Sequence, residues 1–194
     1  MDTTDSDALD REDMARLSAG QEAALDRLMD RHAQVVFHFL CRMLGNEEDA
    51  NDLAQETFVR VFRARESYRP EQRFIPWLLT IAANLARNQL RWRARHPALS
   101  LDAESESTGL TAGDCLPSPL ATPHQQTVTT ERAEAVRAAV QGLPDDLREA
   151  IVLCEWHEMA VIEAAVVLQT TPKAVEARLY RARKLLRERL RRWL

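Results

Sequence analysis

Basic side chains gather at the C-terminal end of the chain, where nine Lys and Arg residues stand against two carboxylates over residues 173–194. Their apolar neighbours fall at helical spacing on one narrow stripe, formed by Val175, Leu179, Ala182, Leu186 and Leu190. Thr171 and Pro172 suit the start of a helix, and the apolar segment 160–168 precedes them. This pattern predicts a helix-turn-helix that enters the major groove of DNA. The alternative is a solvated basic face on a C-terminal helix.

A second basic cluster consists of Arg87, Arg91, Arg93 and Arg95, and no acidic residue lies between them in the sequence. Asn84 and Asn88 lie one helical turn apart, and Trp77 and Trp92 flank the cluster. A helix with these side chains can track a single strand by charge and stacking, and its Asn amides can read a base edge. The alternative is an ordinary helix end, where arginines interact favourably with the dipole.

Acidic residues dominate elsewhere, with nine acids against three bases over residues 1–30. The segment 49–56 also carries Asp49, Asp52 and Glu56, so it is not a DNA surface. Its carboxylates are either solvated or meet a basic protein partner.

Two pairs of side chains could each offer ligands from one helix face, namely His38 with Cys41 and Cys154 with His157. Both cysteines lie among apolar residues, where a free thiol usually behaves as a small hydrophobe. No nucleophile with its base, glycine-rich phosphate loop or convergent carboxylate pair is found in the sequence. We therefore expect no enzyme active site, no metal and no cofactor.

Composition points to a soluble, all-helical protein. The 194 residues are 45% hydrophobic and 29% charged, with only 5 glycines. No long apolar run predicts a transmembrane helix, and the acidic N-terminus does not suit a secretory signal. Three widely spaced cysteines are typical of reduced thiols, so we expect a cytoplasmic location without membrane insertion.

The pattern of apolar residues predicts two helical domains, 1–95 and 131–194. Residues 96–130 between them have no apolar periodicity and contain Pro, Ser, Thr and acidic residues, so they are predicted to form a flexible acidic linker. Gly20 and Gly45 end helices, and Asn46 caps the next one. The helices are expected over residues 10–19, 21–44, 46–62, 76–95, 131–142, 145–156, 159–168 and 172–192.

Taken together, these segments resemble a bacterial RNA polymerase sigma factor of the extracytoplasmic function (ECF) type, in the sigma-70 family. The matching strings are Gly45–Phe62 and Arg73–Leu90 in the first half, and Gly142–Ala150 and Thr171–Lys184 in the second. The resemblance covers about residues 16–95 and 131–192. Nothing stands between the two blocks except the linker, as in ECF members that lack region three.

The resemblance implies an all-α fold with a region 2 bundle and a region 4 helix-turn-helix. It assigns docking on the clamp of the polymerase β′ subunit to Asp49, Asp52, Leu53, Gln55 and Glu56. It assigns minus-ten DNA to Arg73, Phe74, Trp77, Asn84, Arg87, Asn88 and Arg91, with an unstacked base held by the loop 67–74. It assigns minus-thirty-five DNA to Thr171, Lys173, Glu176, Ala177, Arg178, Tyr180, Arg181 and Arg183.

The sequence departs from the family pattern at a few positions. Ala83 and Glu176 stand where many members carry a basic residue, and Gln169 replaces the usual turn glycine. The segment 160–162 replaces a more polar entry to the helix-turn-helix. These departures bear on the promoter sequence that is read.

We therefore expect a sigma factor that binds core RNA polymerase through the β′ clamp and β flap, recognises promoter DNA and is controlled by an anti-sigma factor. One alternative is a helix-turn-helix regulator that binds duplex DNA without polymerase core. Another is a metal- or redox-responsive interaction protein that uses the His and Cys pairs. The first half separates these hypotheses, because a simple regulator needs no acidic docking helix followed by a strand-reading helix.

Overall fold

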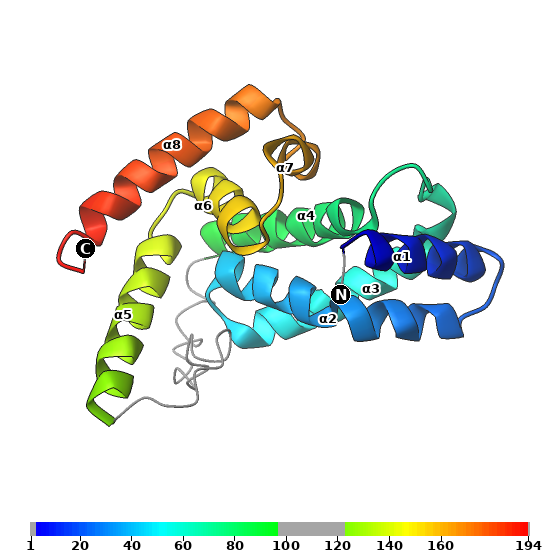
Figure 1. Cartoon of the computed structure of the whole chain (residues 1–194), viewed down its shortest axis with the longest axis horizontal. Helices are drawn as coiled ribbons and strands as arrows, with labels where there is room; N and C mark the ends of the chain where they lie inside the picture. The colour runs from blue at the N-terminus through cyan, green and yellow to red at the C-terminus, as the bar shows by residue number, and fades with distance from the viewer. Residues whose placement is uncertain (1–2, 97–122, 194) are drawn as a thin grey trace.

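The computed structural model describes residues 3–96 and 123–193, which form helices joined by turns and loops, without a strand (Figure 1). This confirms the predicted all-α class, with one helical unit on each side of residues 97–122. In the described part of the chain, no helix combines the length and apolar character needed to span a membrane.

The first half contains four α-helices and one short 3-10 turn, namely α1 (Thr3–Ser18), α2 (Ala23–Leu44), α3 (Glu47–Arg63), η1 (Arg65–Ser67) and α4 (Phe74–Arg95). Helices α2, α3 and α4 pack against one another around the inward residues that the periodicity predicts, including Phe39, Phe58 and Leu78. Burying such side chains is the main favourable term in the stability of this bundle, at roughly 1.5–3 kcal/mol for each large residue.

Local capping residues set two of the predicted helix boundaries. Gly45 ends α2 in the left-handed conformation, with φ of 68°, and its N–H donates to the Cys41 carbonyl. The Asn46 side chain then accepts a 2.8 Å hydrogen bond from the Asp49 N–H at the start of α3. These adjacent residues therefore reverse the chain between two long helices.

Helix α1 begins at Thr3, earlier than the predicted start at residue 10. Ionic contacts hold it, because Asp10 and Asp13 are buried against α2. Arg31 reaches both carboxylates, at 3.0 Å from Asp10 and 2.7 Å from Asp13, and His32 Nε2 lies 2.8 Å from Asp10. Apolar periodicity cannot reveal contacts of this kind.

The second half contains α5 (Pro123–Gln141), α6 (Asp145–Ile151), the π-helical turn η5 (Val152–Trp156), α7 (Val161–Val167) and α8 (Pro172–Arg189). Helix α5 starts within the segment predicted to be linker. Pro suits a first helical position, and no Gly or Pro follows before Gly142, so the backbone chemistry permits this earlier start. The rest of the predicted linker, residues 97–122, and Cys115 within it lie outside the described residues.

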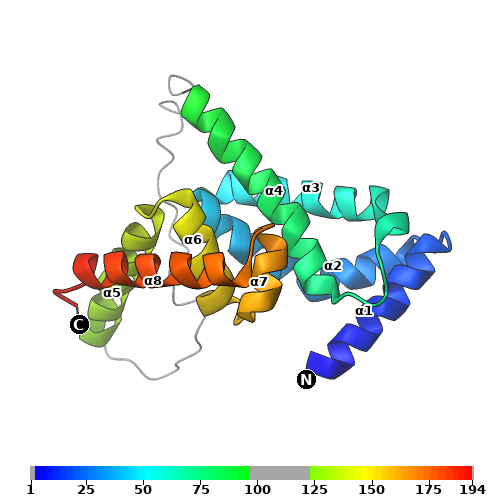
Figure 2. The same ribbon diagram turned by 90° about the horizontal axis from the view of Figure 1, so that it is seen from above.

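The two halves pack directly against each other. Figures 1 and 2 show α6 and α7 lying between α8 and the first-half bundle. Helix α7 contacts α4, and α5, α6 and η5 contact α2. The buried apolar side chains of both halves form one continuous cluster, in which Leu40 and Ile151 are both fully enclosed. In this arrangement the linked units therefore share a core.

Gln169 occupies a left-handed backbone conformation, with φ of 51°, in the turn between α7 and α8. A residue with a Cβ in this conformation raises the free energy of the folded state by roughly 1–2 kcal/mol relative to glycine. Glycine has the opposite effect on the unfolded state, because its greater backbone freedom stabilises that state by about 0.4–1 kcal/mol. We expect Gln169→Gly to raise the free energy of unfolding by about 0.5–1 kcal/mol and the melting temperature by about 1–3 °C. Thermal and urea unfolding followed by circular dichroism measure this change. Gln169→Ala keeps the Cβ and should give no gain, so an equal gain in both variants would contradict the explanation.

Candidate nucleic-acid interface

Helix α8 presents the strongest candidate for a DNA-reading surface. The Thr171 hydroxyl accepts a 3.2 Å hydrogen bond from the Ala174 N–H, and Pro172 occupies the first turn, as predicted. Val175, Leu179 and Ala182 are buried, which fixes the rotation of the helix. The predicted contact residues that lie fully on the exposed side are Thr171, Lys173, Glu176, Ala177, Tyr180, Arg181 and Arg183.

Two predicted DNA contacts of α8 have carboxylate partners in the second half. Arg183 contacts Glu155 at 2.6 Å, and both side chains are about half exposed, at 57% and 44%. Arg178 lies 3.7 Å from Asp146. Exposed ion pairs of this kind contribute roughly 0–1 kcal/mol, so phosphate groups can compete for these guanidinium groups.

A shallow groove between α3 and α4 contains Asn84, and its other lining residues are Arg60, Arg63, Ala64 and Ile81. The Asn84 carbonyl oxygen accepts a 2.8 Å hydrogen bond from Arg87, and the Asn88 oxygen accepts one of 2.5 Å from Arg91. The two amides therefore lie on one side of α4, as predicted. Each amide oxygen accepts a hydrogen bond from an arginine about one helical turn further along.

Aromatic packing supports the loop that precedes α4. Tyr68 and Trp77 meet edge to face at 5.2 Å, and Phe74 lies 6.0 Å from Tyr68 and 5.9 Å from Trp77. The Tyr68 hydroxyl donates to the Gln72 carbonyl at 2.9 Å, and burial raises its pKa to about 12. Phe74 is 1% exposed. The sequence assigned Phe74 to DNA, but in this structure it supports the loop from beneath.

Two other predicted minus-ten residues, Arg73 and Arg87, are bound by carboxylates. Arg73 contacts Asp7 of α1 at 2.7 Å and Glu163 of α7 at 2.6 Å. Arg87 contacts both oxygens of Glu149 on α6, with its Nη2 at 2.9 Å from Oε1 and its Nε at 3.1 Å from Oε2. Burial raises the pKa of Glu149, which is 4% exposed, while the hydrogen bond from Arg87 opposes that rise. These pairs join residues far apart in sequence and were not predicted.

Some of the predicted docking residues of α3 are exposed, and others contact residues of the same chain. Asp52 and Gln55 are exposed, and Leu53 packs partly into the core. Glu56 pairs with Arg60 at 2.8 Å on the helix surface. Asp49 forms an ion pair with Arg93, which also donates to the Leu44 carbonyl at 3.0 Å. Arg93 therefore joins the end of α4 to the α2–α3 turn. The sequence had placed it in the basic cluster predicted to track a single strand.

The His and Cys pairs have the properties of packed side chains. His157 is inward and meets the Phe39 ring at 5.9 Å, and burial first, then Arg42 and His38, lower its pKa to about 4. Burial raises the pKa of Cys41 to about 11 and also raises that of Cys154, which disfavours reactive thiolates. Among the residues that the structure describes, no three His, Cys, Asp or Glu side chains are grouped to hold a metal ion.

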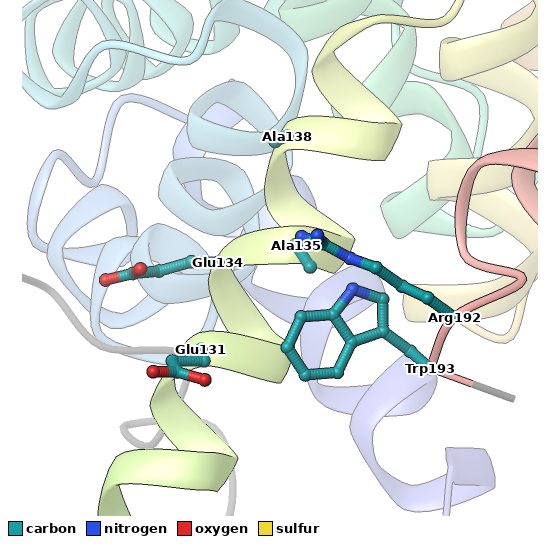
Figure 3. Close-up of a pocket in the computed structure, with 6 residues that line it drawn as sticks. All are labelled: Glu131, Glu134, Ala135, Ala138, Arg192 and Trp193. Atoms are coloured by element: carbon teal, nitrogen blue, oxygen red, sulfur yellow. The ribbon is translucent and has the colours of Figure 1, made fainter.

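Another hollow lies between α5 and the residues that follow α8 (Figure 3). Arg192 lies over the Trp193 ring at 5.0 Å, across from Glu131 and Glu134. None of the predicted contact residues lines this hollow. It is therefore separate from the candidate DNA surface.

Comparison with known proteins gives two family matches in the same order as the two helical units. Residues 28–96 match Sigma-70 region 2, and residues 133–186 match Sigma-70, region 4. RNA polymerase sigma factor CarQ of Myxococcus xanthus is 37% identical over 177 residues, covering 91% of this chain and 95% of the relative. ECF RNA polymerase sigma factor SigW of Bacillus subtilis is 31% identical over 177 residues, covering 91% and 94%.

A solved structure, CnrH in complex with the cytosolic domain of CnrY, is similar in fold and sequence. It aligns with a TM-score of 0.66 and 29% identity over 94% of this chain and 97% of that chain. The first family match covers α3 and α4, and the second covers α6, α7 and most of α8. The chain belongs to the sigma-70 family of RNA polymerase sigma factors, in its ECF group.

Proposed function

We propose that this chain is a promoter-directing sigma subunit that binds core RNA polymerase through α3, reads the minus-ten strand with α4 and reads the minus-thirty-five duplex with α8. The observation that carries the proposal is the exposed basic face of α8, capped by Thr171 and anchored by a buried stripe. It lies in the same chain as a second basic helix with base-reading amides. Core-dependent transcription from a cognate promoter is the direct test.

On duplex DNA, the N-terminal part of α8 enters the major groove. In its first turn Pro172 has no N–H and the Ala174 N–H is bonded to Thr171, so the turn offers a phosphate the backbone N–H and the side-chain cation of Lys173. Arg181 follows about two turns later on the exposed face and meets a phosphate. Glu176 and Ala177 lie between them, where they tune the sequence that is read.

On melted DNA, Asn84 offers a base contact from the α3–α4 groove, and Arg60 and Arg63 supply positive charge beside it. The loop before α4 holds an unstacked base, which costs a few kcal/mol that contacts must return. Tyr68 and Trp77 stiffen that loop through their edge-to-face contact. Preorganised contacts of this kind favour strand opening, because the single strand binds them and the duplex does not.

The exposed acids of α3 suit a basic protein surface, which in this family is the clamp of the polymerase β′ subunit. Region 4 would contact the β flap. The similar CnrH chain is bound to the cytosolic domain of CnrY, which supports an anti-sigma factor as a partner of this chain. These roles need no catalysis by the chain itself, and they place it in the cytoplasm with RNA polymerase.

A regulator acting on duplex DNA without core is the other candidate, and it would use α8 alone. It leaves the exposed Asp52 and Gln55 of α3 and the Asn84 groove without a role. Transcription that requires both core polymerase and this chain would exclude that alternative.

The docking role predicts that Asp52→Arg combined with Glu56→Arg blocks core binding, because like charges would meet across the interface. The fold should survive, since exposed substitutions usually change stability by about 0.5 kcal/mol or less. Pull-down with purified core measures the loss. Asp26→Arg with Asp30→Arg makes the same charge change at two exposed positions of α2 and should leave binding intact. Wild-type core binding by the folded Asp52/Glu56 variant would contradict the docking assignment.

The strand-reading role predicts that Asn84→Ala reduces promoter opening while core binding is retained. One good base contact is worth about 1–3 kcal/mol, which corresponds to roughly a 5- to 150-fold change. Permanganate reactivity of promoter thymines in the holoenzyme measures opening. Gln89→Ala, a change to another amide of α4, serves as the matched control. Equal opening by all three proteins, with unchanged preference among minus-ten variants, would make Asn84 a surface amide only.

The phosphate role of Arg181 predicts that Arg181→Ala weakens binding of the full chain to minus-thirty-five duplex for all sequences alike. The slope of log affinity against log salt should fall by about one unit. Arg187→Ala removes the same charge from an exposed position further along α8 and should change the slope less. Titrations at several salt concentrations distinguish them. An unchanged affinity and slope for Arg181→Ala would remove this residue from the DNA interface.

A further inference from the structure

Helix α1 contacts both ends of the segment that connects α3 to α4, which contains the loop 67–74. At one end, the Ser18 hydroxyl donates to the Arg65 carbonyl at 3.1 Å. At the other end, Asp7 forms an ion pair with Arg73 at 2.7 Å. Because an α-helix rises 1.5 Å per residue, Asp7 and Ser18 are separated by about 16 Å along α1. One helix therefore spans the loop and is attached near both of its ends.

We propose that α1 is a positioning element for the minus-ten reaction, which holds the loop 67–74 in the conformation that receives the unstacked base. This role rests on the function proposed above, in which that loop holds a base of the melted strand. Asp10 and Ser18 of α1 and His32 of α2 are then positioning residues, which act through the loop without contacting DNA themselves.

The start of α4 is held by tertiary contacts rather than by a side-chain cap. At α3 and α8, Asn46 and Thr171 accept hydrogen bonds from backbone N–H groups of the first turn. Within the described structure, the residue before α4, Arg73, makes no capping hydrogen bond with its side chain. The first turn of α4 therefore depends on what its first residue contacts. That residue is Phe74, which is 1% exposed.

The Phe74 ring is enclosed by three other rings, one of which is oriented from α1. Its centroid lies 5.2 Å from that of His32, 6.0 Å from Tyr68 and 5.9 Å from Trp77. His32 is 3% exposed, and its Nε2 lies 2.8 Å from Asp10 Oδ1. A carboxylate on one ring nitrogen fixes the orientation of an imidazole. Asp10 therefore sets the ring against which Phe74, and with it the first turn of α4, packs.

Asp10 is bonded in a way that stability alone does not explain. Its side chain is fully buried, and its Oδ1 meets both His32 and Arg31, the latter at 3.0 Å. Its Oδ2 has no hydrogen-bond partner among the described residues. An unpaired buried oxygen raises the free energy of the folded state, and apolar residues can often replace a buried ion pair without loss of stability. A carboxylate here is accounted for by the orientation that it gives to His32.

Asp13 provides a matched control on the same helix. It is 4% exposed, and its oxygens contact Arg27 and Arg31 of α2, each at 2.7 Å. Removing either Asp10 or Asp13 should weaken the packing of α1 against α2. Only Asp10 contacts His32, so only its removal should disturb the loop.

The test measures binding of holoenzyme to fluorescent minus-ten single strands in which one base at a time is replaced by an abasic site. With the wild-type chain, one position should show a loss of affinity of roughly 5- to 150-fold, the range of one good base contact. Asp10→Ala should abolish this abasic penalty while core binding is retained. Asp13→Ala should keep the penalty. Asp10→Asn retains an oxygen that can accept from His32, so it should keep most of the penalty.

Ser18→Ala is a second variant with less risk to the fold, because Ser18 is exposed. It removes the hydrogen bond to the Arg65 carbonyl and should reduce the abasic penalty without changing helical content. If Asp10→Ala fails to fold, as judged by circular dichroism, the comparison of Ser18→Ala with the wild type decides the result.

An equal abasic penalty in the wild type and in the folded Asp10→Ala and Ser18→Ala variants would overturn the positioning role. So would an equal loss of the penalty in Asp10→Ala and Asp13→Ala, since general weakening of α1 would then explain both. A wild type without a penalty at any position would also overturn it, because no base would be held.

Each of these results leaves the sigma-factor role intact, since core-dependent transcription by the wild type tests that role separately. A wild type that shows the abasic penalty but never supports transcription would count against the proposed function and leave the positioning role standing.

Discussion

The guanidinium group of Arg87 joins the two halves of this chain, because it pairs with Glu149 of α6 and donates to the Val167 carbonyl at the end of α7. Its partner Glu149 has a raised pKa because burial outweighs the stabilisation from Arg87. The cost of desolvating a buried ion pair can match or exceed its attraction. The pair therefore adds little net stability to the contact between the two halves, and apolar packing between the halves supplies most of that stability. A charged pair with that balance fixes geometry, and it can separate without a large loss of stability.

Helix boundaries that depend on local chemistry could be predicted from the sequence, and those that depend on distant contacts could not. Gly45, Asn46 and Thr171 act through backbone geometry and hydrogen bonds to neighbours within four residues, so their residue types were sufficient. Residues 3–9 of α1 lie before the predicted start, and among them Asp7 pairs with Arg73, which directly precedes α4. No apolar period encodes that contact, and the predicted helix accordingly began too late.

The candidate site shows the same division. Composition and spacing identified the cations of α4 and α8, but residue type does not tell which cation binds a carboxylate of the folded chain. Arg93 pairs with Asp49, and Arg73 pairs with Glu163, across long stretches of sequence. Phe74 is a similar case, because an aromatic residue at a helix start can face a base or the core. Here it is enclosed by His32, Tyr68 and Trp77.

Ion pairs on the two basic helices differ in how easily DNA can displace them. Arg183 and Glu155 of the second half are both about half exposed, so water and salt already compete for their charges. A phosphate can replace Glu155 without any movement of the backbone. Arg87 is 27% exposed and is paired with a carboxylate that is almost fully enclosed, so replacing Glu149 by a phosphate requires α6 to move away from α4. In the proposed function, duplex contacts by Arg183 therefore need no movement between the halves, whereas a phosphate that replaces Glu149 on Arg87 needs α6 to move away from α4.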